Sequence, residues 1–139
     1  VEHRMERVAT MHGVNYINDS KATNVDACRY ALEAMNTPTI LIIGGKDKGN
    51  DYEPIKELVK EKCAGLVYLG ADNTKLHQNF DQLGLPVADT HSMKDCVMVC
   101  ANMAKTGYTV LLSPCCASFD LFKNMEDRGE QFKTLVRNL

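Results

Sequence analysis

The sequence predicts an α/β fold of three layers, a mostly parallel, Rossmann-like sheet with helices on both faces. Short apolar runs alternate with segments of about 10–15 residues whose apolar positions recur at helical spacing. The run TILIIGG at 39–45 is apolar at successive positions, as in a strand buried on both faces. Because the 139 residues contain no internal repeat or long linker, we expect residues 1–139 to form a single domain.

Five apolar runs, most of them rich in β-branched residues, predict the strands. They lie at 14–18, 39–45, 65–70, 86–90 and 108–114. In the segments that follow each run, the apolar residues fall on one side of a helix. Helices are therefore predicted at 24–35, 52–63, 73–83, 92–107 and 118–139.

Individual residues support these boundaries. In the helix predicted at 24–35, Cys28 and Leu32 lie one turn apart on the apolar side. Ser92 and Gly107 are typical of the first and last positions of a helix. Gly129 is a point at which the last helix could break, since glycine lowers helix stability.

The composition argues against several classes of function. The formal net charge of −2 provides no excess of positive charge for a nucleic-acid backbone. No apolar run approaches the ~20 residues that a membrane-spanning helix requires. No cysteine or histidine spacing typical of a metal site is present. We therefore predict no nucleic-acid partner, no membrane insertion and no metal ligands in this chain.

The cysteine pattern indicates packing rather than cross-linking. The six cysteines stand at 28, 63, 96, 100, 115 and 116, and none forms a CxxC pair. Cys96 and Cys100 share an apolar helix face, where reduced thiols act as small hydrophobic side chains. Together with the lack of a recognisable signal peptide, this pattern predicts a cytoplasmic protein.

Polar segments follow three of the five predicted strands. They are NDSKATN at 18–24, GGKDKGND at 44–51 and SPCCASFD at 113–120. Ligands of parallel α/β sheets collect beyond the carboxyl ends of the strands, so we expect these segments to form one rim. The rim would offer two ammonium groups and two hydroxyls, from Lys21, Thr23, Lys48 and Ser118.

That set of side chains suits a small anion. Charge-assisted hydrogen bonds would fix a ligand with more than one carboxylate, or with a carboxylate beside a phosphate. Asp19 fits such a rim only if it accepts hydrogen bonds from hydroxyls, for example those of a ribose. The sequence therefore predicts an anion site that is shared with a sugar.

Each segment on its own also has a structural interpretation. GGKDKGND matches neither the P-loop pattern nor GxGxxG, and alone it is typical of a solvated turn. Ser118 either caps the helix predicted to follow it or helps that helix terminus to bind an anion. These alternatives are open at the level of the single motifs.

Four motifs taken together resemble one family. EHRMERV at 2–8, INDSKATN at 17–24, IIGGKDKGND at 42–51 and LLSPCCASFDLFKNMEDRGEQF at 111–132 are similar, in this order, to the C-terminal domain of the Mur ligases of peptidoglycan synthesis. Within that family, the Ser-Lys-Ala-Thr segment resembles the members that add D-glutamate. Residues 52–107 carry no such motif.

The resemblance implies an ATP-dependent, amide-forming ligase of the bacterial cytoplasm. In that reaction ATP phosphorylates the carboxylate of UDP-N-acetylmuramoyl-L-alanine, and the amine of D-glutamate attacks the acyl phosphate. ATP and Mg would be bound mainly by a central domain with the P-loop. We expect this chain, which begins with Val, to be cut from a longer protein, to be inactive alone, and to close over the central domain with residues 1–8 as the hinge.

The resemblance also implies roles for individual residues. For the nucleotide, these are His3, Arg4, Asp19 at the ribose and Lys21 at the phosphate. For D-glutamate, Thr23 and Lys48 would hold the α-carboxylate. Ser118 and Phe119, with backbone N–H groups near Met125, would hold the side-chain carboxylate. Lys21 and Lys48 would be the catalytic residues.

Three positions depart from the family pattern. Phe119 stands where leucine is expected, Met125 where phenylalanine is frequent, and Lys46 where aspartate is usual. Both apolar changes preserve the character of the side chain. For Lys46 we expect a solvated side chain and assign no function from the sequence, and for Cys116 we predict a packing role.

Two other hypotheses belong to different classes of function. A stand-alone regulatory module that binds a nucleotide or phosphate would explain the glycine-rich loop and the lysines. It would not explain four motifs in one order. A scaffold without a ligand would leave unrelated surface chemistry at the three strand ends.

Overall fold

The computed structural model describes all residues from 1 to 139. Six strands form one sheet in the order β1-β2-β6-β3-β4-β5. The strands are β1 Glu6–Met11, β2 Val14–Asn18, β3 Thr39–Gly44, β4 Cys63–Leu69, β5 Val87–Thr90 and β6 Thr109–Cys115. The helices are α1 Val25–Glu33, α2 Glu53–Lys62, α3 Thr74–Phe80, α4 Met93–Met103 and α5 Met125–Arg137, with a short 3-10 turn at Asp81–Leu83.

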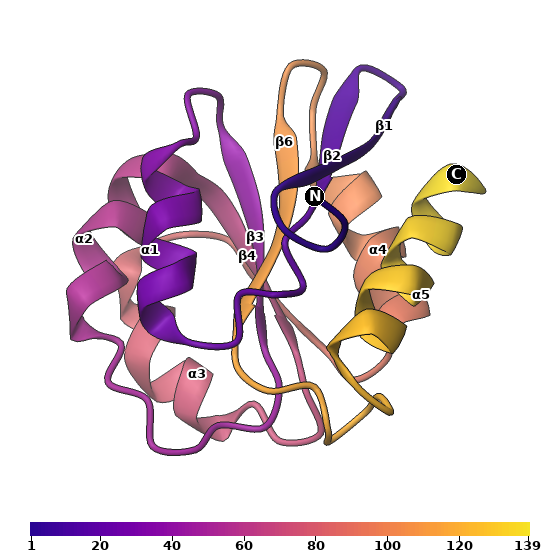
Figure 1. Cartoon of the computed structure of the whole chain (residues 1–139). Helices are drawn as coiled ribbons and strands as arrows, with labels where there is room; N and C mark the ends of the chain where they lie inside the picture. Colours follow the sequence, from indigo (N-terminus) through magenta and orange to yellow (C-terminus); the bar gives the residue numbers. More distant parts are fainter.

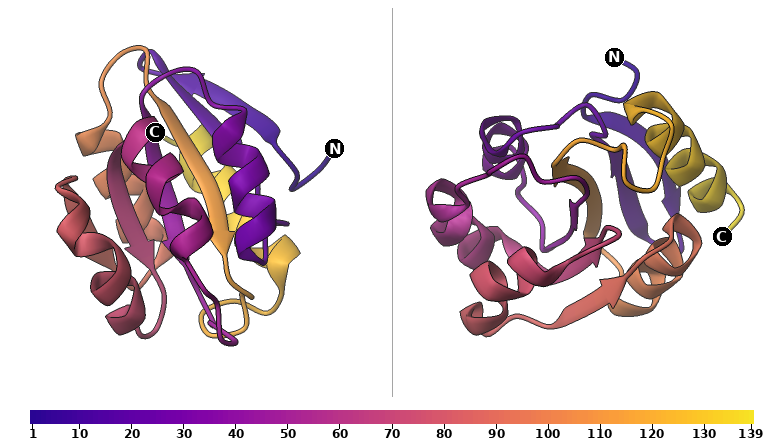
Figure 2. Two further views of the ribbon diagram at one scale, coloured as in Figure 1. Left: turned by 90° about the vertical axis from the view of Figure 1, so that its left-hand side faces the viewer. Right: turned by 90° about the horizontal axis from the view of Figure 1, so that it is seen from below.

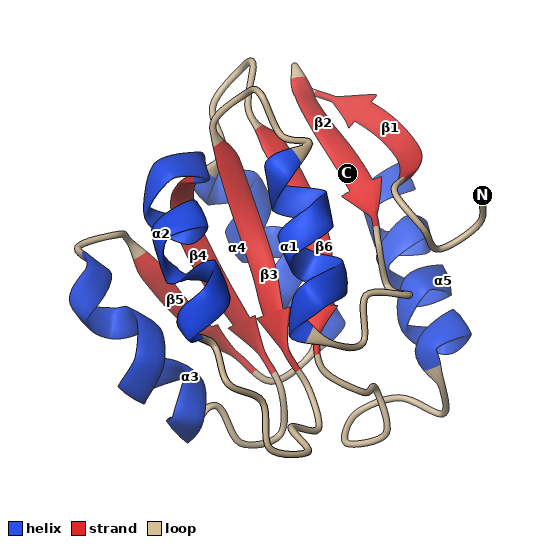
Figure 3. Ribbon diagram, turned by 60° about the vertical axis from the view of Figure 1, so that its left-hand side comes forward, coloured by secondary structure: helices blue, strands red, loops and turns tan.

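The three-layer prediction is confirmed. Helices α1, α2 and α3 pack on one face of the sheet, and α4 and α5 cover the other (Figures 1 and 3). Along β3, Leu41 and Ile43 face the first helical layer whereas Ile40 and Ile42 face the second. This two-sided burial is the reason why the strand lacks the alternation of a half-exposed strand. No helix is both long and apolar enough to cross a membrane.

The structure differs from the predicted elements at both ends of the chain. Residues 6–11 form the edge strand β1, which pairs antiparallel with β2 and was not predicted. The last helix begins at Met125 rather than at 118, because Asn124 caps it by accepting from the backbone N–H of Asp127 at 2.7 Å. The prediction that Gly129 could break this helix is wrong, since α5 continues through it.

All six cysteines are buried free thiols, as predicted for packing residues. They lie in both apolar layers, so each face of the sheet contains thiols. Burial raises the pKa of Cys63 to about 12 and that of Cys116 to about 11. These two thiols are therefore held in their neutral form and contribute as apolar side chains.

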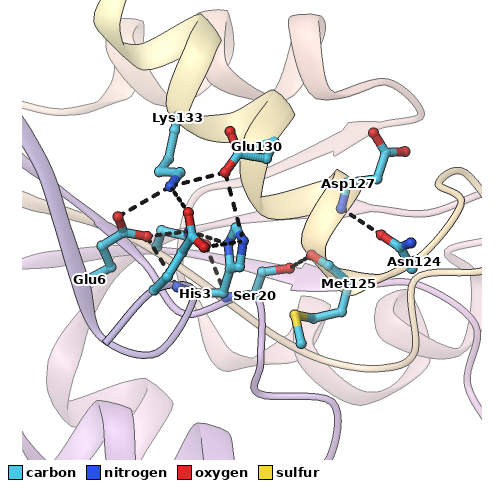
Figure 4. A network of polar contacts seen from close by, with 10 residues as sticks. His3, Glu6, Ser20, Asn124, Met125, Asp127, Glu130 and Lys133 are labelled. Atoms are coloured by element: carbon cyan, nitrogen blue, oxygen red, sulfur yellow. Dashed lines mark hydrogen bonds and ion pairs between the residues drawn. The ribbon is translucent and has the colours of Figure 1, made fainter.

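A polar cluster around the buried ammonium of Lys133 attaches the start of the chain to α5 (Figure 4). The Lys133 ammonium lies 2.9 Å from Glu2, 3.2 Å from Glu6 and 3.1 Å from Glu130. Burial opposes protonation, but the hydrogen bonds that the ammonium donates to these carboxylates outweigh it and raise the pKa of Lys133. Residues 2–6 are therefore held against the domain by charge-assisted contacts.

His3 completes this cluster and explains the glycine in α5. Its imidazole is buried, with Nδ1 2.9 Å from the Asn18 amide nitrogen, and its backbone has a φ of 63°. A Cβ added at Gly129 would overlap the imidazole ring. Gly129 is thus required for close approach of the ring to the helix, not for a break in the helix.

We expect Gly129→Ala to destabilise the protein by about 1–3 kcal/mol, because overpacking against His3 exceeds the ~1 kcal/mol that alanine normally adds inside a helix. Urea unfolding measures this change. The double variant His3→Ala/Gly129→Ala removes the ring, so its alanine at 129 should no longer be destabilising. Additive effects of the two substitutions would contradict the proposed contact.

Candidate functional site

The loops that follow β2, β6 and β3 lie side by side at the carboxyl edge of the sheet. The right-hand view of Figure 2 looks onto this edge. Backbone hydrogen bonds join the loops, from Cys115 N–H to the Ala22 carbonyl at 3.0 Å and from Lys46 N–H to the Ala117 carbonyl at 2.8 Å. The three polar segments of the sequence thus share one rim.

Two glycines allow the loop after β3 to approach its neighbours. Gly44 and Gly45 have φ values of +133° and +137°, which side-chain-bearing residues rarely adopt. A Cβ at Gly44 would lie 2.5 Å from the Leu69 carbonyl oxygen, and one at Gly45 would clash with the Ala117 carbonyl. The loop can therefore lie against the ends of both β4 and β6.

The carboxylate of Asp47 organises the same loop from inside. It accepts hydrogen bonds from the backbone N–H groups of Gly49 at 2.8 Å and Asn50 at 2.7 Å. It also accepts from the Tyr52 hydroxyl at 2.7 Å and the Lys75 ammonium at 3.1 Å. Burial opposes ionisation, but these hydrogen bonds lower the pKa of Asp47 below its usual range. The Asp47 carboxylate therefore already has hydrogen-bond partners within the protein.

A small pocket opens where the three loops meet. It has a volume of about 140 Å³, and we call it the lysine pocket. Its lining residues are Thr23, Lys46, Lys48, Asn50, Cys115, Cys116 and Ala117. It brings together Thr23 and Lys48, two of the residues predicted to hold a carboxylate. No Asp or Glu lines it, so its charged side chains are all cationic.

Ser118 directly follows the lining residue Ala117 in the chain but does not itself line the pocket. Its side chain is buried, and its Oγ makes no hydrogen bond within the chain. Buried hydroxyls without partners are rare in proteins and point to a group that completes them. The interpretation of Ser118 as the cap of the following helix is wrong, because Asn124 has that role.

A second, larger pocket of about 410 Å³ lies on the other side of residues 19–23, against α1. Arg4, Asp19 and Lys21 line it, so it unites three of the residues predicted to bind the nucleotide. Ala27 and Tyr30 of α1 contribute an apolar wall. We call this the α1 pocket.

The Asp19 carboxylate is fixed at the floor of the α1 pocket. One oxygen accepts from the Ser113 hydroxyl at 2.8 Å and the other from the Met5 N–H at 3.1 Å. Burial raises the pKa of Asp19, although both hydrogen bonds and nearby Arg4 act in the opposite direction. Each oxygen retains a lone pair that could accept from a ligand hydroxyl.

Besides Ser118, three predicted site residues lie outside both pockets. His3 is buried in the polar cluster with Lys133 and does not line the α1 pocket. The Phe119 side chain is 61% exposed, and the Lys48 ammonium lies 6.0 Å from its ring centroid. Met125 accepts a hydrogen bond from the Ser20 hydroxyl through its backbone carbonyl at 2.7 Å.

Arg128 connects the loops after β2 and β6, and no sequence pattern predicted this role. Its buried guanidinium donates to the Ser20 hydroxyl at 2.9 Å, the Ser20 carbonyl at 2.7 Å and the Cys116 carbonyl at 3.0 Å. Burial lowers its pKa to about 10. The only signal in the sequence was its position one turn before buried Phe132 on α5.

The chain is similar to known proteins along its whole length. The family described as "Mur ligase, glutamate ligase domain" matches residues 3–116. The UDP-N-acetylmuramoylalanine--D-glutamate ligases of Bacteroides fragilis and Porphyromonas gingivalis are 66% and 58% identical over the whole chain. The chain spans 32% and 31% of the length of these two relatives.

Solved structures share the fold at low sequence identity. MurF ligase from Thermotoga maritima in complex with ADP matches 99% of this chain and 32% of its own, with a TM-score of 0.66 and 14% identity. E. coli FolC in complex with ADP matches the same shares of the two chains, with a TM-score of 0.66 and 15% identity.

We expect Arg128→Met to lower the free energy of unfolding by about 2–4 kcal/mol, because two buried carbonyls lose their donor. Amide exchange should accelerate most at Cys115 and Lys46, whose hydrogen bonds join the loops. Arg29→Met, at a surface ion pair on α1, is the matched control and should cost at most about 1 kcal/mol. Uniformly faster exchange throughout the sheet would contradict a local role in joining the loops.

Asp19→Asn should stabilise the protein at neutral pH. The pKa of Asp19 is raised on folding, so between its unfolded and its folded pKa the folded state retains a proton that the unfolded chain has lost. The stability of the protein therefore falls as the pH rises between these two pKa values. Asparagine is neutral at every pH. The urea midpoint of the variant should be higher than that of the wild type at pH 7.5. The difference should vanish as the pH is lowered and the Asp19 carboxyl becomes protonated. A more stable wild type at pH 7.5 would show that the hydrogen bonds outweigh burial.

Proposed function

The chain belongs to the Mur ligase family as its C-terminal domain, and on that premise we propose that it binds D-glutamate. It would serve the ligase that joins D-glutamate to UDP-N-acetylmuramoyl-L-alanine with ATP, through an acyl phosphate. The observation that carries this proposal is the lysine pocket, which brings Thr23 and Lys48 together. The unpartnered hydroxyl of Ser118, the residue after the lining residue Ala117, supports it.

The chemistry of the pocket suits an amino acid with two carboxylates. Lys48 would bind the α-carboxylate by a charge-assisted hydrogen bond, with the Thr23 hydroxyl as a second donor. Ser118 and backbone N–H groups near Met125 would receive the side-chain carboxylate, with Phe119 at the entrance. The lining residue Lys48 is exposed, and so is Phe119 near it, so an amino acid could enter the pocket from solvent.

The α1 pocket would receive part of the ATP. Asp19 has free lone pairs for the ribose hydroxyls, and Arg4 and Lys21 supply positive charge for the phosphates. His3 would act on the nucleotide site indirectly, because its ring is buried beside Asn18.

The metal ligands of the reaction would come from elsewhere in the enzyme. The one group of metal-ligating side chains in this chain, Glu2, His3 and Glu130, lies beside the Lys133 ammonium. We therefore propose that Mg and the triphosphate are bound by the central domain of the whole ligase. Residues 1–8 would connect the two domains, and the enzyme would act in the bacterial cytoplasm in cell-wall synthesis.

The two pockets explain how the domain would assist the reaction. Binding D-glutamate at both carboxylates leaves its amine as the free group and fixes the direction of attack. Lys21 and Lys48 would stabilise the negative charge of the tetrahedral intermediate and the departing phosphate by electrostatic preorganisation. Closure of the domain on its neighbour would bring both pockets to the acyl phosphate. The chain alone would bind but not ligate.

Lys48→Ala in the whole ligase tests this proposal. The KM for D-glutamate should rise about 10- to 100-fold, because one charge-assisted hydrogen bond contributes roughly 1.5–3 kcal/mol. The KM for the UDP-sugar should remain within about twofold, since the lysine does not contact it. Lys60→Ala, at the opposite edge of the sheet in the last turn of α2, is the matched control. An equal loss for both substrates would show that Lys48 does not hold D-glutamate.

A further inference from the structure

The lysine pocket contains a second ammonium group that the proposed contacts do not use. Lys46 lines it together with Lys48. Neither lysine forms an ion pair with any carboxylate of the chain within 4.0 Å. Two ammonium groups without an ion-pair partner at this 140 Å³ opening make it a positively charged site, which favours an anion that contacts both.

The acids near this loop are engaged elsewhere. Asp47 accepts four hydrogen bonds from within its own loop, Tyr52 and Lys75. Lys46 also lines a neighbouring cavity of about 510 Å³ that contains Asp72 and Asp120. The Asp120 carboxylate accepts from the backbone N–H groups of Ala71 and Leu121, each at 2.9 Å.

The backbone of Lys46 is held in place although its side chain is exposed. Its N–H donates to the Ala117 carbonyl at 2.8 Å, and the two residues form an isolated antiparallel bridge. Ala117 directly precedes Ser118. The Lys46 side chain is therefore attached to the backbone near Ser118, the residue proposed to hold the side-chain carboxylate.

The proposed partners of that carboxylate are all neutral. A hydroxyl and backbone N–H groups can donate to an amide oxygen as well as to a carboxylate, so they distinguish D-glutamate poorly from D-glutamine. A cation distinguishes the two, because only the carboxylate carries charge. We propose that Lys46 is this specificity-determining contact, binding the side-chain carboxylate while Lys48 binds the α-carboxylate. The inference rests on the proposed D-glutamate site.

Titration of the chain with D-glutamate and D-glutamine, followed by NMR amide shifts, tests the inference. Lys46→Gln should weaken D-glutamate binding about fivefold, which corresponds to about 1 kcal/mol for an exposed ion pair. Its affinity for D-glutamine should be unchanged. Lys46→Arg should restore the preference, and Lys60→Gln is the control for the loss of one positive charge.

The outcomes separate the two proposals. Lys48→Gln should weaken both ligands, because both carry the α-carboxylate. If D-glutamate shifts no amides near Thr23, Lys48 and Ser118 in the wild type, the binding site itself is wrong. If the wild type binds D-glutamate there and Lys46→Gln behaves like Lys60→Gln, the site stands and the role of Lys46 is overturned.

Discussion

The buried guanidinium of Arg128 is the contact on which the arrangement of the rim depends. Transferring a cation from water into a protein interior costs several kcal/mol unless polar groups replace its hydration. Here the replacement comes from two loops that are distant in sequence, through Ser20 and Cys116. The charge is satisfied only when both loops are in place, so α5 holds them in one relative position.

This arrangement of the loops leaves one pocket on each side of residues 19–23. Asp19 and Lys21 face the α1 pocket, whereas Thr23 lines the lysine pocket. Residues 19–23 therefore form the wall between the proposed nucleotide and amino-acid sites. A shift of this wall would change both sites together, which gives a physical reason for fixing it from behind by Arg128 and by the Cys115–Ala22 hydrogen bond.

The sequence was most informative where one physical requirement dominates. Burial on both faces made β3 recognisable, and alternating strands and helices predicted the parallel sheet. The edge strand β1 escaped prediction because it is only partly buried and contains the charged residues Glu6 and Arg7. The start of α5 was misplaced because Ser118 and Asn124 are both good caps, and only the tertiary position of residues 118–124 decides between them.

Individual site residues show the same limit. The convergence of Thr23 and Lys48 could be predicted, because both follow strands of one parallel sheet. The burial of His3 could not, since it depends on a contact with Gly129 across 126 positions of the sequence. Arg128 resembled an ordinary surface arginine because its partners, a hydroxyl and backbone carbonyls, leave no pattern of opposite charge.

The distribution of thiols has a practical consequence. Because all six cysteine residues are buried, we expect an alkylating reagent to modify them mainly after the surrounding structure has opened. Cys96 and Cys100 lie on the buried side of α4, and Cys28 and Cys63 lie in the apolar layer on the opposite side of the sheet. Cys115 and Cys116 lie at the end of β6, at the rim. The molecule thus contains native reporters whose rates of modification can compare the opening of its two layers and of its binding edge.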